Sequence, residues 1–243
     1  MKYDFCEFKN STDDKNAELY FFGDIVSDEW SRWTNDDQCP SNVKKLIDEI
    51  GDSDVDIHIN SAGGDVFAGV AIYNMLKRCS GTKTVYVDGL AASIASVIAM
   101  AGDNIIIPEN AFMMIHNAWT IGMGNANELK KLADTLEKID AGILSTYKAN
   151  AVDEVSEKQL KKMMDNETWI RGSEASDIFK NIKTTDAIAA AASVYASDKF
   201  LNTFRNVPDE FKNEVARPNS ANVPEELKKI ANYAKAVRAG YLL

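Results

Sequence analysis

The sequence has little of what several kinds of site require. Only two of its 243 residues are histidine, and its three cysteines are an odd number with no CxxC spacing. The cysteine count excludes a simple disulfide framework and a zinc site built from cysteine alone. We therefore expect reduced thiols, as in a cytoplasm, and neither a metal nor another cofactor.

An excess of positive charge and a long apolar run are also missing. The formal net charge is −10, and no basic stripe is present that could neutralise phosphates, which argues against nucleic acid as a partner. The longest apolar stretch, near residues 90–101, is too short to span a bilayer, and the charged residues 1–16 lack the apolar core of a signal peptide. We expect a cytoplasmic protein of a bacterium or a phage, without a membrane partner.

Strand and helix patterns alternate along most of the chain. Residues 18–25, rich in aromatic and β-branched residues, are predicted to form a strand that ends in a turn at Gly23-Asp24. Further strands are predicted over 54–60 and 82–89. VFAGVAIYNMLKRC (66–79) has the spacing of a buried helix, and GLAASIASVIAMAG (89–102) follows the third strand as a helix of small residues. The alternation predicts an α/β architecture.

Residues between and after these segments complete the pattern. A broken helical pattern begins after Ser27, a candidate N-cap, and a second helix runs from Pro40 to Gly51. Two further short strands are predicted over 102–108 and 111–116.

The longest predicted helix covers residues 124–151, with leucine and isoleucine near heptad spacing. Such a helix packs on the domain or projects from it to meet another subunit. Beyond about residue 190, prolines appear among charged residues. We therefore predict a domain over 1–190 and a charged C-terminal appendage over 191–243, partly helical or mobile.

The two histidines differ in where they fall on their strands. His58 lies mid-strand and alternates with Asp56 and Asn60, which indicates a position on a face of the sheet. His116 ends its strand, and strand ends are where reacting groups collect in α/β folds. His116 is the better candidate for a general base, and the alternative is that neither histidine is catalytic.

Ser93 falls in the first turn of the small-residue helix, where backbone N–H groups lack partners and the helix dipole favours negative charge. It is an N-cap or a nucleophile, and taken alone the capping role is favoured because no GxSxG motif is present. Ser96, one turn further on, is expected to be buried packing.

The stretch SAGGD (61–65) separates a predicted strand from a helix. Its paired glycines permit positive φ and a close approach of the backbone to a ligand, but the full P-loop pattern is absent. The N–H of Gly64, together with an N–H beside Ser93, would make an oxyanion hole.

Three segments together resemble the signature segments of the Clp-type proteolytic subunit (ClpP) family of serine proteases. They are INSAGGDVFAG (59–69), DGLAASIASVIAMAGD (88–103) and MMIHNA (113–118), in order and within a match over residues 18–187. The chain looks most like the ClpP-like head maturation proteases of phages and prophages. The resemblance implies a crotonase-like α/β fold of stacked ββα units with a projecting handle helix, and homo-oligomeric seven-membered rings that usually stack as a double ring.

The resemblance also implies roles for residues. Ser93 would be the nucleophile, His116 the general base, and the backbone N–H groups of Gly64 and Ile94 the oxyanion hole. A polypeptide substrate would lie extended against the strand after His116. Residues 120–128 would form a strand and the start of the handle helix.

The third member of the triad departs from the family, which usually has aspartate. The matching segment, MMDNETWIRGSEA (163–175), places Glu167 at the acid position, with Asp165 as the second choice. A glutamate can orient a histidine as an aspartate does. The alternative is that both are solvated charges.

The leading function is a serine endopeptidase whose chemistry needs no ATP and which cuts peptide bonds inside an oligomeric chamber. Its partners would be phage capsid or scaffold proteins, in the host cytoplasm or the prohead, or a Clp-type ATPase that feeds it unfolded chains. Residues 1–17 do not display the features that dock such an ATPase. The alternatives are a non-catalytic ring-forming subunit and an acyl-CoA enzyme on the same scaffold.

Overall fold

A computed structural model describes residues 16–187 and 204–208. The chain divides into two compact units after Asn206, and the description below concerns the first of them. The predicted boundary at residue 190, the N-terminal residues 1–15 and nearly all of the predicted appendage lie outside the described residues.

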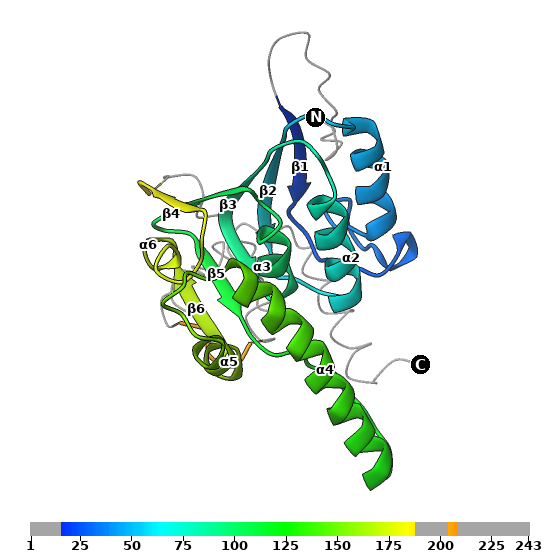
Figure 1. Cartoon of the computed structure of the whole chain (residues 1–243). Helices are drawn as coiled ribbons and strands as arrows, with labels where there is room; N and C mark the ends of the chain where they lie inside the picture. The colour runs from blue at the N-terminus through cyan, green and yellow to red at the C-terminus, as the bar shows by residue number, and fades with distance from the viewer. Residues whose placement is uncertain (1–15, 188–203, 209–243) are drawn as a thin grey trace, which may run out of the picture. The chain divides into compact units, whose positions relative to one another are not determined.

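Strands and helices alternate as the sequence predicts, and the described part is an α/β fold (Figure 1). The elements are β1 (Ala17–Phe21), the 3-10 helix η1 (Glu29–Ser31), α1 (Pro40–Ile50), β2 (Val55–Ser61), α2 (Val66–Lys77), β3 (Lys83–Ala92), α3 (Ile94–Ala99), β4 (Asn104–Pro108), β5 (Phe112–Ile115), α4 (Ala126–Asn150), α5 (Glu157–Asp165), β6 (Thr168–Arg171), α6 (Gly172–Ala175) and β7 (Ile182–Thr185). None of the helices described here is long and apolar enough to cross a membrane.

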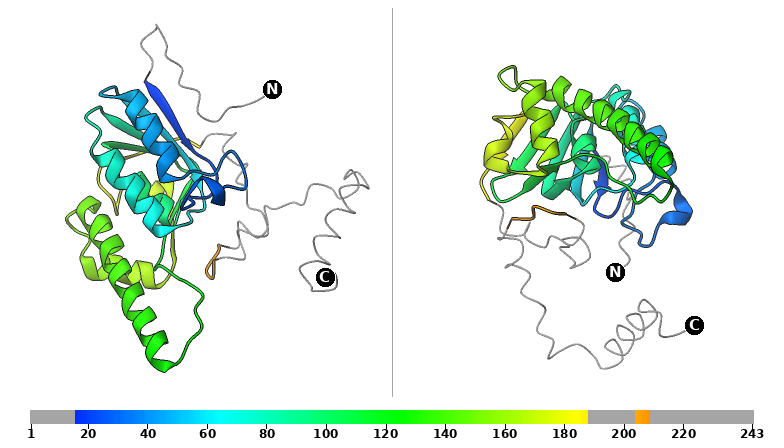
Figure 2. Two further views of the ribbon diagram at one scale, coloured as in Figure 1. Left: turned by 90° about the vertical axis from the view of Figure 1, so that its right-hand side faces the viewer. Right: turned by 90° about the horizontal axis from the view of Figure 1, so that it is seen from below.

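One sheet organises the fold. Its strands lie in the order β1-β2-β3-β4-β7, all parallel, and β5 and β6 extend it from the end of β3. Helices α1, α2 and α3 cover one face of the sheet (Figure 2). Parallel strands are joined by crossover connections, here through these helices, and all their carboxyl ends therefore lie at one edge of the sheet. Ligand sites form at that edge in α/β folds.

The period-two pattern of β2 separates the two faces. Val55, Ile57 and Ile59 are buried in the core beneath the helices. On the opposite face the ring of His58 stacks between Tyr20 and Tyr86, with ring centroids 4.8 and 4.9 Å apart. The predicted position of His58 on a face of the sheet is confirmed.

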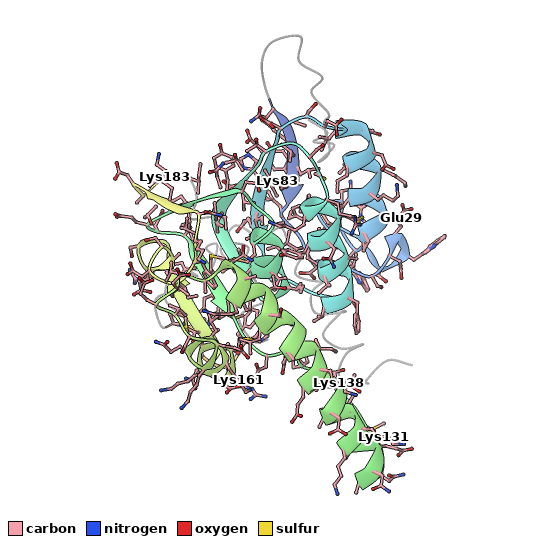
Figure 3. All side chains as sticks on the ribbon, viewed as in Figure 1. Glu29, Lys83, Lys131, Lys138, Lys161 and Lys183 are labelled. Atoms are coloured by element: carbon pink, nitrogen blue, oxygen red, sulfur yellow. The ribbon has the colours of Figure 1, made fainter. Side chains whose placement is uncertain are left out.

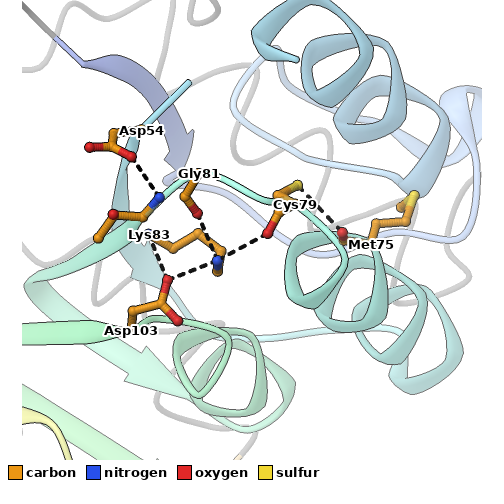
Figure 4. A network of polar contacts seen from close by, with 7 residues as sticks. Asp54, Met75, Cys79, Gly81, Lys83 and Asp103 are labelled. Carbon is orange, nitrogen blue, oxygen red and sulfur yellow. Dashed lines mark hydrogen bonds and ion pairs between the residues drawn. The ribbon is translucent and has the colours of Figure 1, made fainter. Parts of the chain in front are cut away.

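The beginning of β3, away from that edge, is fixed by the buried Lys83 (Figure 4). Its ammonium donates to the carbonyls of Cys79 (3.2 Å) and Gly81 (2.9 Å) and pairs with the Asp103 carboxylate at 2.8 Å. A buried ammonium is costly unless it is paired and hydrogen-bonded. Here every partner comes from a segment next to the strand, so Lys83 ties that end of the sheet together.

Helix α4 packs on the domain at one end and projects from it at the other, so both arrangements that its sequence allows are present. A capping box of Asn125 and Glu128 starts it, and Ile143, Leu144 and Tyr147 near its other end are buried in the core. Its first half projects from the sheet, and its lysines there, such as those labelled along the projecting part in Figure 3, face solvent.

Three local predictions were wrong. The strand predicted over 82–89 does not stop at Gly89 but continues to Ala92, because its last residues pair with β5. The first short helix is capped by Asp28 and not by Ser27, since the Asp28 carboxylate accepts the N–H groups of Trp30 and Ser31.

The third concerns the segment before α4. No strand forms over residues 117–125 of this chain, and the helix begins at Ala126. A strand needs a neighbour for its backbone groups, and β5, the preceding strand, is already paired on both sides by β3 and β6. The side chains of Trp119, Ile121 and Met123 in this segment are exposed.

Candidate active site

Strand pairing brings the predicted site residues to one edge of the sheet. The end of β3 runs parallel to β5, with Ala92 opposite Met114, and the Ser93 N–H donates to the Met114 carbonyl at 2.9 Å. The next residues of that partner strand lead to His116. Parallel pairing of two strand ends therefore sets Ser93 and His116 side by side.

The strand β6 brings the acid from the other side. It pairs with β5 in antiparallel fashion, with Ile115 opposite Thr168. One step further in this register, Glu167 comes opposite His116. All three predicted triad positions therefore lie just beyond strand ends that neighbour one another in the sheet.

The Ser93 hydroxyl contacts the imidazole of His116, with Oγ 2.7 Å from Nε2. Ser93 occupies the N-cap position of α3, but its side chain makes no capping hydrogen bond. Its backbone has φ 54° and ψ −128°, a conformation that residues with a side chain rarely adopt and that is found at functional sites. The serine thus sits on a strained turn with its hydroxyl directed to the histidine.

The glycine turn of residues 61–65 packs against this serine turn. Gly63 and Gly64 have φ of 97° and 143°. A Cβ on Gly63 would lie 2.8 Å from the Ser93 Cβ and 3.1 Å from the Ile94 nitrogen, and one on Gly64 would overlap the Ile25 carbonyl. Both positions therefore need glycine, as the sequence indicates.

The two predicted oxyanion donors are available. Within residues 16–187 and 204–208, no hydrogen bond uses the N–H of Gly64 or that of Ile94. Ile94 is the first residue of α3, where the N–H has no intrahelical acceptor. Because the glycine turn packs against the serine turn, these two donors flank Ser93 from different loops.

Ser96 supports the serine turn from behind. It is fully buried, as predicted, and its hydroxyl donates to the Ser93 carbonyl at 2.6 Å. With its proton used there, Ser96 Oγ accepts from the Tyr147 hydroxyl at 2.7 Å. Burial raises the pKa of Tyr147 well above its usual value, so the phenol keeps that proton. The sequence indicates nothing of Tyr147, whose partner lies 51 residues away.

The pKa of His116 lies below its usual value near 6.5. Burial is the largest cause, the Glu167 carboxylate opposes it by raising the pKa, and the Arg205 guanidinium lowers it further. The imidazole is therefore neutral near pH 7 and able to accept a proton.

The two candidate acids have different surroundings. Glu167 is 9% exposed, and its carboxylate accepts the backbone N–H groups of Arg205 (3.0 Å) and Asn206 (2.7 Å). Asp165 is exposed, and the amide of Asn117 together with Lys161 holds its pKa below the usual range. Glu167 is thus the buried one of the two acids, and its charge acts on His116.

No hydrogen bond in the described part of the chain joins Glu167 to His116. The residues that bond to its carboxylate, Arg205 and Asn206, fall within the predicted appendage, and no motif in the sequence indicates them.

His58 is not part of this site, since its Nδ1 pairs with the Asp88 carboxylate at 2.9 Å. The described residues contain no group of three or more His, Cys, Asp or Glu side chains placed to hold a metal ion.

Comparison with known proteins finds a family match that includes the residues of this site. Residues 31–178, more than half of the chain, match the Clp protease family. The chain belongs to the Clp protease family. The matched range contains the serine turn, the glycine turn, His116 and both candidate acids, whereas Arg205 and Asn206 lie beyond it.

Individual relatives are moderately similar. The chain is 28% identical over 160 residues to the ATP-dependent Clp protease proteolytic subunit 2 of Thermobifida fusca, covering 65% of this chain and 75% of that protein. It is 35% identical over 124 residues to the ATP-dependent Clp protease proteolytic subunit 1 of Chlamydia trachomatis, covering 49% of this chain and 63% of the relative.

Among solved structures, a variant of ClpP1 from Listeria monocytogenes is similar with a TM-score of 0.55 and 26% identity. The match covers 69% of this chain and 91% of that one. The predicted ClpP-like fold and the resemblance to that family are therefore confirmed.

Proposed function

We propose that this member of the Clp protease family is a serine endopeptidase in which Ser93 is the nucleophile and His116 the general base. The observation that carries the proposal is the 2.7 Å contact between Ser93 Oγ and His116 Nε2 on a strained turn at the start of a helix. Nucleophile and base within hydrogen-bond reach are the signature of this chemistry.

The steps follow from the positions of these groups. His116 Nε2 takes the proton of the Ser93 hydroxyl as Oγ attacks the scissile carbonyl carbon, and the oxygen of that carbonyl becomes negative. The free N–H groups of Gly64 and Ile94 bind this oxyanion, and each such donor is worth about 10²–10³ in rate. His116 then gives its proton to the leaving amine, and water reverses the sequence to free the serine.

The acid is the remaining part. Glu167 stabilises the imidazolium when its carboxylate reaches the second ring nitrogen of His116. The register of β5 and β6 supports Glu167 over Asp165 for this role, because Glu167 is opposite His116 and buried, whereas Asp165 faces solvent and pairs with Asn117.

Substrate and assembly belong to the same proposal. The exposed side chains of Trp119, Ile121 and Met123 directly follow the base, and the first half of α4 projects beside them. Exposed apolar side chains in one segment mark a contact surface. We propose that an extended polypeptide and further copies of the chain meet there in a seven-membered ring, stacked as a double ring.

The biological setting of the proposal keeps both options that the sequence raises. One is maturation of phage capsid or scaffold proteins, and the other is degradation of chains supplied by a Clp-type ATPase. Both place the enzyme in the host cytoplasm or the prohead.

A second candidate is a non-catalytic ring-forming subunit. The specific observation in its favour is that the Glu167 carboxylate accepts hydrogen bonds from the backbone of Arg205 and Asn206 and none from His116. An acyl-CoA enzyme on the same scaffold has no such support, because the bond between Ser93 and His116 would have no role in it.

Labelling with a fluorophosphonate probe separates the two candidates. We expect the wild type to be labelled, Ser93→Ala to lose the label, and Ser176→Ala, a change at an exposed serine away from the site, to be labelled like the wild type. Labelling that survives in Ser93→Ala contradicts the assignment. A ring in native mass spectrometry without labelling or peptide turnover at any pH favours the non-catalytic subunit.

A further inference from the structure

A short segment from beyond the matched family region is docked on the acid side of the site. We call residues Phe204–Asn206 the acid clasp. Its backbone N–H groups at Arg205 and Asn206 donate to the two different carboxylate oxygens of Glu167, at 3.0 and 2.7 Å. The Asn206 side-chain amide donates to the carbonyl of Asn166 at 2.7 Å. Three hydrogen bonds therefore hold the clasp on two successive residues.

Apolar contact adds to these bonds. The ring of Phe204, only 9% exposed, meets His116 edge-on at a centroid distance of 5.7 Å. It meets Trp169 in the same way, also at 5.7 Å and with the two rings nearly perpendicular. Edge-to-face aromatic pairs are favourable beyond the area that they bury. The clasp thus contacts both the proposed base and the residue two places after the proposed acid.

The clasp binds the carboxylate that His116 would need as the acid of a triad. A catalytic histidine must donate its Nδ1–H to the acid, which fixes the tautomer and stabilises the imidazolium. Hydrogen bonds from backbone N–H groups to a carboxylate are charge-assisted and strong. Glu167 accepts two of them, and within the described residues it makes none to His116. A carboxylate has about four acceptor sites, so the clasp acts by fixing where the Glu167 carboxylate lies and not by using up its acceptors.

We propose that the acid clasp is an inhibitory segment built into the chain: docked, it holds Glu167 away from His116, and its release lets the triad close. The proposal rests on the serine peptidase function proposed above. The occupant is the chain's own segment, and the surface that receives it consists of Glu167, Asn166, His116 and Trp169. It accounts for a complete nucleophile and base beside an acid that is engaged elsewhere.

Release has a predictable effect on the titration of His116. The charged groups that act on its imidazole are Glu167 and Arg205. Undocking removes the Arg205 guanidinium and the Phe204 ring from its side and brings the Glu167 carboxylate to its Nδ1. Each of these three changes favours the protonated ring.

The test uses full-length variants with altered donors. Asn206→Pro removes one N–H donor to Glu167, and Asn206→Ala is the matched control that keeps this N–H and loses only the bond to Asn166. We expect Asn206→Pro to raise kcat for a fluorogenic peptide roughly tenfold to a hundredfold, the equilibrium effect of losing one hydrogen bond to a charged group. Asn206→Ala should give a smaller rise in kcat. Phe204→Ala weakens docking through the aromatic contacts with His116 and Trp169, and it should raise kcat even if the proline variant does not fold.

A nuclear magnetic resonance titration reads the same event without turnover. The chain has two histidines, so His58 serves as an internal reference. The pKa of His116 should rise in Asn206→Pro and Phe204→Ala, and the rise should shrink when Glu167→Gln is added. A segment with only a structural role would not produce this dependence on Glu167.

The outcomes separate this proposal from the peptidase itself. Equal or lower kcat in both activating variants, with an unchanged pKa of His116, overturns the clasp and leaves the peptidase standing. A rise of that pKa without labelling of Ser93 in any variant shows that the clasp controls the surroundings of His116, but it overturns the peptidase and with it the inhibitory role.

Discussion

His58 and His116 belong to the same sheet, and their surroundings give the same ring two different chemistries. His58 lies mid-strand on an open face, stacked between two tyrosines, with Asp88 at 2.9 Å from Nδ1. His116 lies just beyond the end of its strand, with Ser93 Oγ at 2.7 Å from Nε2 and a phenylalanine ring against it. One ring is held by a carboxylate and the other faces a hydroxyl.

The shifts of the two pKa values have opposite signs. Burial alone would lower the pKa of His58, but the bond to Asp88 and the charges of Glu18 and Asp56 raise it above its usual value. At His116 burial prevails over the single favourable charge of Glu167. The two pKa shifts differ in sign because a carboxylate is bonded to His58, whereas none is bonded to His116 in this structure.

The largest expected effect is the loss of catalysis at one histidine only. His116→Gln should lower kcat for a peptide by at least about 10³-fold, because it removes the proton acceptor of Ser93. His58→Gln, the matched change on the other face, should leave kcat within about twofold, since its ring does not reach the site. Steady-state kinetics of both variants measures the contrast. Similar losses in the two variants would contradict the separation of a structural and a reactive histidine.

The next effect compares two glycines, one at the site and one remote from it. Gly64→Ala should lower kcat/KM by about 10²-fold, because the new Cβ would overlap the Ile25 carbonyl and displace an oxyanion donor. Gly142→Ala lies in α4 with nothing within 4 Å of the new Cβ, so it should keep full activity and gain roughly 0.5–1 kcal/mol in helix stability.

Kinetics and urea unfolding of the two glycine variants provide the measurement. An active Gly64→Ala enzyme with an unchanged fold would mean that the N–H of Gly64 does not contact the oxyanion.

The features that sequence could predict are those set by local pattern. The alternation in β2 places Val55, Ile57 and Ile59 in the core, and the paired glycines at 63–64 indicate a turn with positive φ. The position of His116 at a strand end favours it over His58 without any relative in view. Its partnership with Ser93 follows from the motif resemblance, and the structure adds the pairing of β3 with β5 as the physical reason.

The features that sequence could not predict depend on contacts between distant segments. The bonds from Arg205 and Asn206 to Glu167 join residues 38 and 39 positions apart, and no periodicity encodes them. The Tyr147 hydroxyl behind Ser96 is a further case. Residues 120–128 were predicted to form a strand and the start of the long helix, and only the helix start is present. The strand was wrong for the same reason, because pairing depends on a neighbour that the segment itself does not specify.

The smallest expected effect concerns the titration of the two rings. In a proton resonance titration, His58 should titrate above pH 6.5 and His116 below it. Because the pKa of His58 is raised by folding, its contribution to stability is present below pH 6.5 and is lost as the pH rises through the folded value. The contribution of His116 has the opposite sign: it is present above pH 6.5 and is lost as the pH falls, because unfolding then takes up a proton.

Asp88→Asn tests the cause of this difference. It removes the largest influence that raises the pKa of His58, so that burial should dominate and the two rings should titrate in the same direction from the usual value. The His116 resonance should not move, which makes it the internal control. Because the pair is partly exposed, we expect urea unfolding at pH 5.5 to report a loss below about 1 kcal/mol, and none at pH 8. If His58 still titrates above pH 6.5 in this variant, the charges of Glu18 and Asp56 are enough to raise its pKa without the bond to Asp88. The difference between the two histidines would then come from the several carboxylates near His58 and not from one hydrogen bond.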